Sequence, residues 1–294
     1  MFRQLGLIGC GLMGGSFALA LKSAGLVRHV VGYSPSAATL ARALDMGVID
    51  ASAPSAADAA SGSDLVLLAM PVAAIEATLR DIQPSIHPGM LVMDVGSTKR
   101  DVVAACESAL GDQRGCFVPA HPMAGREVSG VAHADATLYQ DRLVILTPSR
   151  YTQPEPLARA VDVWRAIGCR VMQMSPAQHD AALAAVSHLP HLLAFAFINS
   201  VTAQTQATDS LAVAGPGFRD FSRIAASEPR MWRDILLANR DEVLSQTRQF
   251  RASLDALEQA MANADGDGDG AALERLIEQA STARANWRLG QRGS

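Results

Sequence analysis

Residues 5–16 read LGLIGCGLMGGS, a short apolar run that ends in closely spaced glycines. The apolar run predicts a buried strand, and the three glycines that follow it have the spacing GxGxxG. Such glycines let a tight turn close and let the next helix approach a pyrophosphate, whose charge the helix N-terminus stabilises. The stretch therefore predicts a dinucleotide-binding strand–turn–helix. Its expected cofactor-binding residues are Gly9, Gly11, Leu12, Met13 and Gly14.

Apolar runs continue to alternate with helix-like segments through the first half of the chain. This alternation predicts a parallel sheet that is covered on both faces. The expected strands are Leu5–Gly9, Val30–Tyr33, Leu65–Ala69, Leu91–Val95, Cys116–Pro119, Leu143–Leu146 and Arg170–Met174. The expected helices between them include Gly14–Ala24, Ala37–Met46, Thr98–Leu110 and Pro156–Ile167. After Ser175 only helical patterns follow, so we place a domain boundary near residue 175, between 1–175 and 176–294.

Composition limits the classes of protein that need to be considered. A chain of 294 residues with 49% hydrophobic and 18% charged residues has the size of about two domains and can bury a large core. The net charge of −4 argues against a nucleic-acid partner, which would require a basic face. The four cysteines have no metal-binding spacing, and no basic segment followed by an apolar run opens the chain. We therefore expect reduced thiols and a cytoplasmic location.

The segment 181–208 has no charged side chain and is long enough to imitate a membrane span. It nevertheless contains His188, Pro190, His191 and Asn199, which are costly in lipid. A helix that is buried on all sides within protein is the better interpretation, and no membrane partner is expected. Because the segment is too apolar to face water, some of the covering helices are expected to come from a second copy in a homodimer.

The end of the second expected strand bears on the choice of cofactor. NAD enzymes usually place Asp or Glu there to bind the ribose 2′-hydroxyl, and this chain has Ser34, followed by Ser36. A neutral hydroxyl tolerates a 2′-phosphate, which slightly favours NADP. The arginine expected for NADP is missing, so NAD stays open.

Two polar positions follow expected strands at the edge of the sheet where ligands bind. Ser97 lies in DVGSTK after the strand 91–95, and His121 follows the strand 116–119, which Pro122 is expected to break. Ser97 or Thr98 could instead cap a helix, and His121 could be a strand-end histidine satisfied by backbone. Their common position at the sheet edge favours a shared site, with His121 as a base.

The second half adds two further groups. His188 and His191 are three residues apart in an apolar helix, where they are either core histidines or site residues; no nearby Asp, Glu or Cys completes a metal site. Arg219 and Arg223 are four residues apart and would share one face of a helix. The guanidinium of an arginine there could bind a substrate carboxylate through two hydrogen bonds. Arg219 could instead lie on a solvent-exposed face of the helix.

Together these motifs resemble the prephenate/arogenate dehydrogenase (cyclohexadienyl dehydrogenase) family. The motifs GCGLMGGS, DVGSTK, HPMAGREVSG, SHLPH and GPGFRDFSRIAASEPRMW occur in the order and spacing of that family, over nearly the whole chain. The resemblance implies a Rossmann-like doubly wound domain followed by an all-α dimerisation domain. It also implies NAD(P)-dependent oxidative decarboxylation of prephenate to 4-hydroxyphenylpyruvate, or of arogenate to tyrosine, without a metal.

The resemblance further implies roles for individual residues of this chain. His121 resembles the base for the ring hydroxyl, Ser97 the residue that orients this hydroxyl and the nicotinamide, and Arg223 the binder of a carboxylate. The residues that resemble the remaining pocket lining are His188, His191, Trp232 and Glu127, the last as a gating residue.

Two alternative functions remain open. One is a related two-domain hydroxyacid dehydrogenase or imine reductase, but those enzymes typically use a lysine in the helical domain and no lysine follows Lys99. The other is a non-catalytic nucleotide-sensing protein, which would not need a histidine, a serine and an arginine from three distant motifs. Nothing in the sequence separates prephenate from arogenate.

Overall fold

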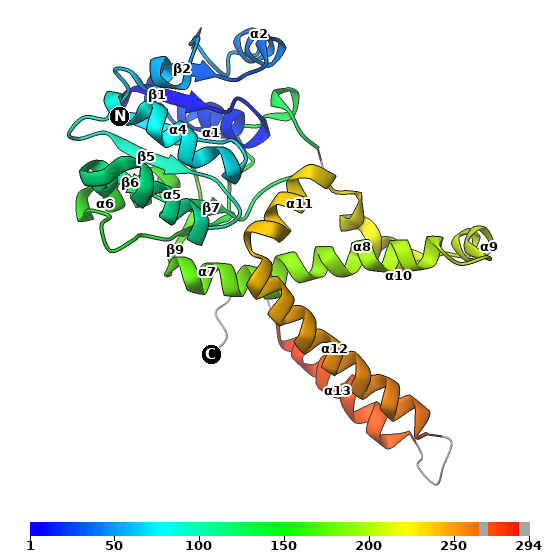
Figure 1. Cartoon of the computed structure of the whole chain (residues 1–294). Helices are drawn as coiled ribbons and strands as arrows, with labels where there is room; N and C mark the ends of the chain where they lie inside the picture. The colour runs from blue at the N-terminus through cyan, green and yellow to red at the C-terminus, as the bar shows by residue number, and fades with distance from the viewer. Residues whose placement is uncertain (127, 265–269, 288–294) are drawn as a thin grey trace. The chain divides into compact units, whose positions relative to one another are not determined.

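The computed structural model describes residues 1–126, 128–264 and 270–287 of the chain (Figure 1). The chain forms two compact units, Met1–Asn239 and Arg240–Ser294. The first unit contains all of the strands that the described residues form, followed by five helices. The second contains two helices, α12 (Arg240–Ala262) and α13 (Ala271–Asn286). Glu127, expected as a gating residue, lies outside the described residues.

A six-stranded parallel sheet forms the centre of the first unit, with the order β3-β2-β1-β4-β5-β6. Its strands are β1 (Phe2–Ile8), β2 (Val27–Tyr33), β3 (Ala51–Ser52), β4 (Leu65–Leu68), β5 (Leu91–Asp94) and β6 (Phe117–Val118). Leu5 of the central strand pairs with Val30 on one side and Leu65 on the other. The order reverses at β1, as in a doubly wound fold, so the predicted parallel sheet is confirmed. The short β3 has too few apolar residues to stand out in the sequence.

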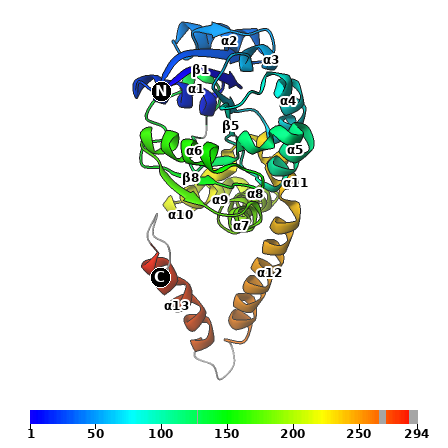
Figure 2. The same cartoon turned by 90° about the vertical axis from the view of Figure 1, so that its left-hand side faces the viewer.

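Helices cover both faces of this sheet, because each face carries its own buried apolar cluster. The helices are α1 (Leu12–Ser23), α2 (Ala37–Asp45), α3 (Ala56–Ala60), α4 (Ile75–Ile82), α5 (Arg100–Leu110) and α6 (Pro154–Ala166). Phe17 of α1 and Trp164 of α6 pack together in one cluster, with ring centroids 4.9 Å apart. Ile75 of α4 and Val102 of α5 belong to the other. Figure 2 shows α4 and α5 on the opposite side of β5 from α6.

A second, three-stranded sheet differs from the expectation of one parallel sheet. It has the order β7-β8-β9, and its strands are β7 (Ala120–Pro122), β8 (Leu143–Leu146) and β9 (Arg170–Gln173). β7 and β8 are antiparallel, whereas β8 and β9 are parallel. The sequence did not predict β7, because Pro122 was expected to end a strand. A proline is tolerated where its missing N–H is not needed, as at a strand end or edge.

The rest of the first unit is helical, as predicted. Its helices are α7 (Pro176–Leu183), α8 (Leu189–Thr202), α9 (Ala207–Ala212), α10 (Pro216–Ser222) and α11 (Pro229–Ala238). A proline often interrupts a helical pattern, but Pro190 does not, since it lies in the first turn of α8. The irregularity is instead a π-helical turn, Ala184–His188, which joins α7 to α8. Such turns often occur at functional sites.

The long apolar helix, expected to be covered in part by a second copy, is not buried on all sides by the described residues of its own chain. Pro176–Thr202 is long and apolar enough to cross a membrane by length and composition, and 28% of its most apolar window is buried. Within α8 only Leu189 and Ala194 are buried. Since one helix of this kind is weak evidence for a membrane span, its polar residues remain the stronger argument. The other helices of the same chain leave much of its apolar surface uncovered.

Candidate active site

The glycine-rich turn between β1 and α1 has the shape that a dinucleotide requires. Gly9 has a φ of +103°, which a residue with a side chain rarely adopts. A Cβ on Gly14 would lie 2.2 Å from the carbonyl oxygen of Gly9, so helix and turn pack too closely for any side chain. A Cβ on Gly11 would meet nothing within 4 Å. No side chain in the described ranges caps α1, so its first N–H groups face this space and fit a pyrophosphate.

Ser34 and Ser36 lie just after β2, in the loop where the ribose of a dinucleotide would be bound. Ser36 caps α2, because its hydroxyl oxygen accepts a hydrogen bond from the backbone N–H of Thr39 (3.2 Å). The hydroxyl oxygen of Ser34 accepts only a long hydrogen bond of 3.4 Å from the N–H of Ser36. Position 34 carries no carboxylate, so the loop is compatible with both the ribose 2′-hydroxyl of NAD and the 2′-phosphate of NADP.

The DVGSTK segment is held by a buried ion pair. Asp94, at the end of β5, and Lys99 are both fully buried, and the Lys99 Nζ lies 2.5 Å from Asp94 Oδ2. Asp94 also accepts hydrogen bonds from the N–H groups of Gly96 (2.7 Å) and Ala120 (3.0 Å). Burial lowers the pKa of Lys99, although Asp94 and Asp180 act in the opposite direction. The pair therefore joins the end of β5 to the start of β7.

His121 lies in the middle of β7 rather than beyond the end of a strand as expected. It pairs with Ile145 of β8, and 9% of its surface remains exposed. Its Nδ1 lies 2.8 Å from Nε2 of His179 on α7. Burial lowers the pKa of His121 well below its ordinary value, and His179, Lys99 and His188 act in the same direction. At neutral pH His121 is thus an uncharged imidazole that can accept a proton.

Asp180 connects α7 to the N-terminus of α5. Its Oδ1 accepts hydrogen bonds from the backbone N–H of Lys99 (2.8 Å) and from Nδ1 of His179 (2.7 Å), and its Oδ2 accepts one from the N–H of Arg100 (2.9 Å). Burial alone would raise the pKa of Asp180, but these hydrogen bonds outweigh it and lower the pKa. Asp180 therefore caps α5, and neither Ser97 nor Thr98 does so, contrary to the alternative considered from the sequence.

His121 and His179 form one histidine cluster, and His188 and His191 form a second one beside Asp180. The side-chain amide nitrogen of Asn239 lies 2.7 Å from the carbonyl oxygen of Asp180 and 3.1 Å from Nδ1 of His188. Trp232 stacks on His191 with centroids 3.5 Å apart and meets the edge of His188 at 6.2 Å. Burial lowers the pKa of His188 to about 4, while Asp180 opposes the shift. Both histidines are thus in contact with Trp232.

Ser97 is half-buried in the loop two residues before Lys99. Arg223 is exposed and begins the 3-10 turn Arg223–Ala226, because α10 ends at Ser222; the single helix expected to carry both arginines is therefore not a regular α-helix. Arg219 is exposed beside Asp220. Among the described residues, no group of three His, Cys, Asp or Glu side chains could hold a metal ion.

Three residues that connect the site were not found by sequence reasoning: His179, Asp180 and Asn239. Each is at least 96% buried in the first unit. A signal for two of them exists in the sequence, since His179 and Asp180 form an adjacent pair at the start of a long uncharged helix. Buried polar side chains almost always have a partner, so this pair indicates a buried hydrogen-bond network. Asn239 has no such signal.

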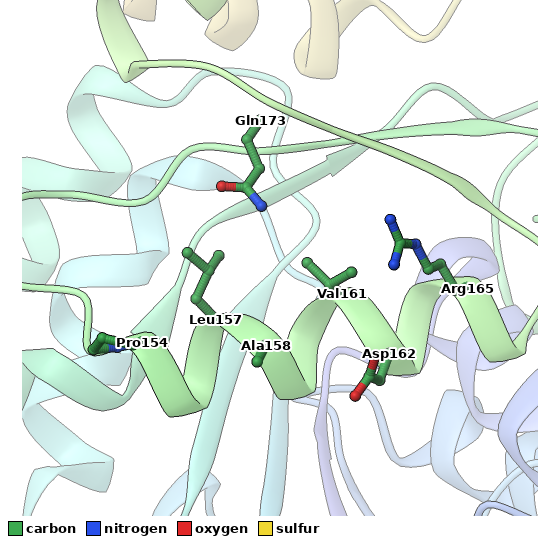
Figure 3. A pocket seen from close by; sticks show the side chains of 7 residues that line it. All are labelled: Pro154, Leu157, Ala158, Val161, Asp162, Arg165 and Gln173. Carbon is green, nitrogen blue, oxygen red and sulfur yellow. The ribbon is translucent and has the colours of Figure 1, made fainter.

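One hollow on the described surface lies away from the two pairs of histidines. Figure 3 shows it along α6, where Leu157 and Val161 project toward Gln173 on β9. It measures about 360 Å³ and shares no residue with the histidine clusters. Its lining is apolar apart from Asp162, Arg165 and Gln173, and it brings together no group that suggests chemistry.

Comparisons with known proteins agree with a nucleotide-binding first half of the chain. Residues 17–173 match the nucleotide-binding domain of prephenate dehydrogenase, and residues 175–279 match its dimerization domain. Cyclohexadienyl dehydrogenase of Zymomonas mobilis is 36% identical over 271 residues, covering 91% of each chain. A crystal structure of prephenate dehydrogenase from A. aeolicus with hydroxyphenyl propionate and NAD+ is 34% identical, has a TM-score of 0.88, and covers 97% of this chain and 98% of its own. Synechocystis arogenate dehydrogenase is 27% identical with a TM-score of 0.82, over 97% of this chain and its whole length.

Proposed function

Because the chain belongs to the prephenate dehydrogenase family, we propose that it catalyses the NAD(P)-dependent oxidative decarboxylation of prephenate, arogenate or both. The product would be 4-hydroxyphenylpyruvate from prephenate and tyrosine from arogenate. As a member of this family the chain is an oxidoreductase of tyrosine biosynthesis. The similarity to enzymes named for either substrate supports both, so the choice between them is left to experiment.

The observation that carries this proposal is His121. The ring is nearly enclosed, is uncharged at neutral pH, and has its Nδ1 engaged by His179. Its other nitrogen can therefore accept the proton of a substrate hydroxyl as the carbinol becomes a carbonyl. General-base catalysis of this kind contributes roughly 10²–10⁴-fold.

The bound cofactor supplies the hydride acceptor, and the protein supplies orientation and charge. Loss of the ring carboxylate as CO2 leaves an aromatic phenol, which drives the reaction forward. The open space at Gly11 beside the uncapped start of α1 fits the pyrophosphate of NAD or NADP. Ser34 at the ribose position slightly favours NADP, and Ser36 lies in the same loop.

The remaining roles come from the helical part and the DVGSTK loop. Ser97 orients the substrate hydroxyl and the nicotinamide. Arg223 binds the side-chain carboxylate, since firm binding of the departing carboxylate would oppose its loss. His188, His191 and Trp232 line the pocket, which their mutual contacts support. Glu127, outside the described residues, would gate its mouth.

We propose a homodimer that forms through the C-terminal helical domain, with the domain boundary near residue 175. The match of residues 175–279 to a dimerization domain supports this, as does the exposed apolar surface of α8. A cytoplasmic location follows from the unpaired cysteines and from the biosynthetic role.

The test is a steady-state assay at 340 nm with prephenate or arogenate, each with NAD or NADP. We expect reduction of the cofactor with at least one pair. His121→Asn should lower kcat about 10²–10⁴-fold while KM changes far less, because the substitution keeps the size of the side chain but removes the base. Near wild-type turnover in His121→Asn would refute the base assignment. An inactive wild-type protein that still binds cofactor would favour the nucleotide-sensing alternative.

A further inference from the structure

Three buried side chains form a continuous line of hydrogen bonds that ends at His121. Asp180 Oδ1 lies 2.7 Å from His179 Nδ1, and His179 Nε2 lies 2.8 Å from His121 Nδ1. Asp180 is held in place by backbone N–H groups of Lys99 and Arg100, at the start of α5. The line is thus fixed at both ends, by a helix N-terminus and by a strand.

The direction of each hydrogen bond follows from the chemistry of the acceptor. A carboxylate only accepts hydrogen bonds, so His179 Nδ1 carries a hydrogen and donates it to Asp180. In a neutral ring the other nitrogen, Nε2, then has a lone pair and can only accept. His121 Nδ1 must consequently donate to it. Nε2 of His121 is left as the one basic nitrogen of that ring.

We propose that His179 and Asp180 are positioning residues that hold His121 in the tautomer with Nδ1 protonated and Nε2 as the proton acceptor. The inference rests on the proposed function only in treating His121 as the base. When the substrate hydroxyl loses its proton, the proton goes to Nε2 of His121, and the hydrogen already on Nδ1 stays there. Asp180 remains a carboxylate and stabilises the imidazolium through His179. The geometry follows the logic of a catalytic triad, in which the carboxylate fixes the tautomer of the base.

His179 offers a sharper test than Asp180. Replacing Asp180 would also remove the acceptor for two backbone N–H groups and so destabilise α5. His179→Gln can place an amide oxygen near the position of Nε2 and keep an acceptor for His121. His179→Leu has similar bulk but no acceptor. His87→Leu is the matched control, since His87 also has both ring nitrogens in hydrogen bonds, with the carbonyl oxygens of Pro88 and Ser63, and belongs to neither histidine cluster.

The first measurement is independent of turnover. In the full-length protein labelled with ¹⁵N-histidine, the ring-nitrogen shifts report which nitrogen carries hydrogen, and His121→Asn assigns the signal of His121. We expect His121 and His179 both to be protonated at Nδ1 only. His179→Leu should give a mixture of tautomers at His121, whereas His179→Gln should keep the native one. A wild-type His121 with hydrogen on Nε2, or a doubly protonated His179, overturns the proposal.

The second measurement is kinetic. A wrong tautomer at a triad histidine can lower kcat by about 10⁴-fold, so we expect His179→Leu to lower kcat at least about tenfold, with KM within a few-fold. His179→Gln should recover most of this loss, and His87→Leu should retain wild-type kcat. If Gln and Leu lower kcat equally while the tautomer is unchanged, His179 is only structural. If the wild type reduces no cofactor, the proposed function fails, and the ¹⁵N result alone still supports or overturns the tautomer.

Discussion

The two parts of the first unit, the sheet part (residues 2–174) and the helical part (residues 176–239), bury their apolar residues to very different degrees. In the sheet part several large side chains, among them Trp164, Tyr139 and Phe17, are completely buried. In the helical part Val186 and Val213 leave 73% and 84% of their surface exposed. The difference indicates that the sheet part carries a closed core of its own, whereas the helical part has large apolar side chains that the rest of the first unit does not cover.

The two parts also contribute different polar groups to the candidate site. The sheet part has open space at a helix N-terminus and carries His121 within a strand, and the helical part supplies His179, which contacts His121, and the contact between Asn239 and His188. Such a division suits an enzyme that binds its cofactor on the sheet part and binds its substrate with groups from both parts. Three predictions test the division, in order of decreasing expected effect.

The largest effect is expected for Phe17→Ala in the sheet part. Phe17 is fully buried and packs against Trp164 and Tyr139, with ring centroids 4.9 and 6.3 Å away. Truncation of a buried aromatic side chain leaves a cavity and lowers the free energy of unfolding by about 3–5 kcal/mol. Urea denaturation should show this loss at every protein concentration, because the cavity lies within one chain.

Phe221→Ala in the helical part is the matched control. Phe221 is 51% exposed and touches Phe197 edge-on at 5.1 Å. We expect little loss of stability within the single chain but weaker self-association, seen as a dilution-dependent fall in mass by light scattering. If Phe221→Ala destabilised the chain as much as Phe17→Ala and left a dimer intact, the two parts would not differ as described.

The second prediction concerns the contribution of the helical part to substrate binding. Arg223→Ala should raise KM for the substrate by an amount equal to about 2–5 kcal/mol, the usual cost of truncating a charge-paired group. Arg223→Lys should raise it less, because lysine keeps the charge but not the planar two-pronged geometry. Steady-state kinetics and cofactor titration measure both effects, and cofactor affinity should stay within a few-fold of the wild type.

Arg219→Ala serves as the control, since Arg219 lies four residues earlier and its side chain is 78% exposed. It should leave KM unchanged. Should Arg223→Ala leave KM unchanged as well and instead dissociate the protein, Arg223 is an assembly residue and the carboxylate is bound elsewhere. Lys99 is then a poor substitute, because its ammonium is buried against Asp94. Arg126 is already paired with Asp135.

The sequence predicted the features that depend on local pattern. The buried strands β1, β4 and β5, the glycine turn and the change to helices after Ser175 follow from apolar periodicity and glycine spacing. β7 was missed because its antiparallel pairing with β8 depends on residues more than twenty positions away. For the same reason His121 was expected beyond a strand rather than within one.

The hydrogen-bond network was hidden from sequence reasoning for a related reason. Lys99 and Asp180 are 81 positions apart, and no local pattern shows that a helix N-terminus is capped by so distant a carboxylate. Which residues cover the exposed face of α8 was also left open by the sequence, because hydropathy indicates that a surface must be covered but not by which copy. His188, His191 and Trp232 are in contact in the structure, and only the resemblance of their motifs gave a reason to consider them together.

The smallest expected effect belongs to the sheet part alone and concerns the cofactor. Ser34→Asp places a carboxylate where the ribose of a dinucleotide would lie, and a 2′-phosphate carries negative charge that the carboxylate repels. At this half-buried position in a surface loop the repulsion should weaken NADP by about tenfold, or about 1.4 kcal/mol, and leave NAD unchanged or slightly better bound.

Fluorescence titration with both cofactors measures the ratio, so NAD acts as the internal control for any loss of folding. Ser36→Asp adds the same charge two positions later and preserves the cap on the N–H of Thr39, because Asp is also a good N-cap. A smaller effect at 36 than at 34 would locate the ribose at Ser34. Equal weakening of NAD and NADP by Ser34→Asp would instead remove this residue from the cofactor site. The preference would then have to come from residues outside the β2–α2 loop, and the assignment of this loop to the ribose would lose its support.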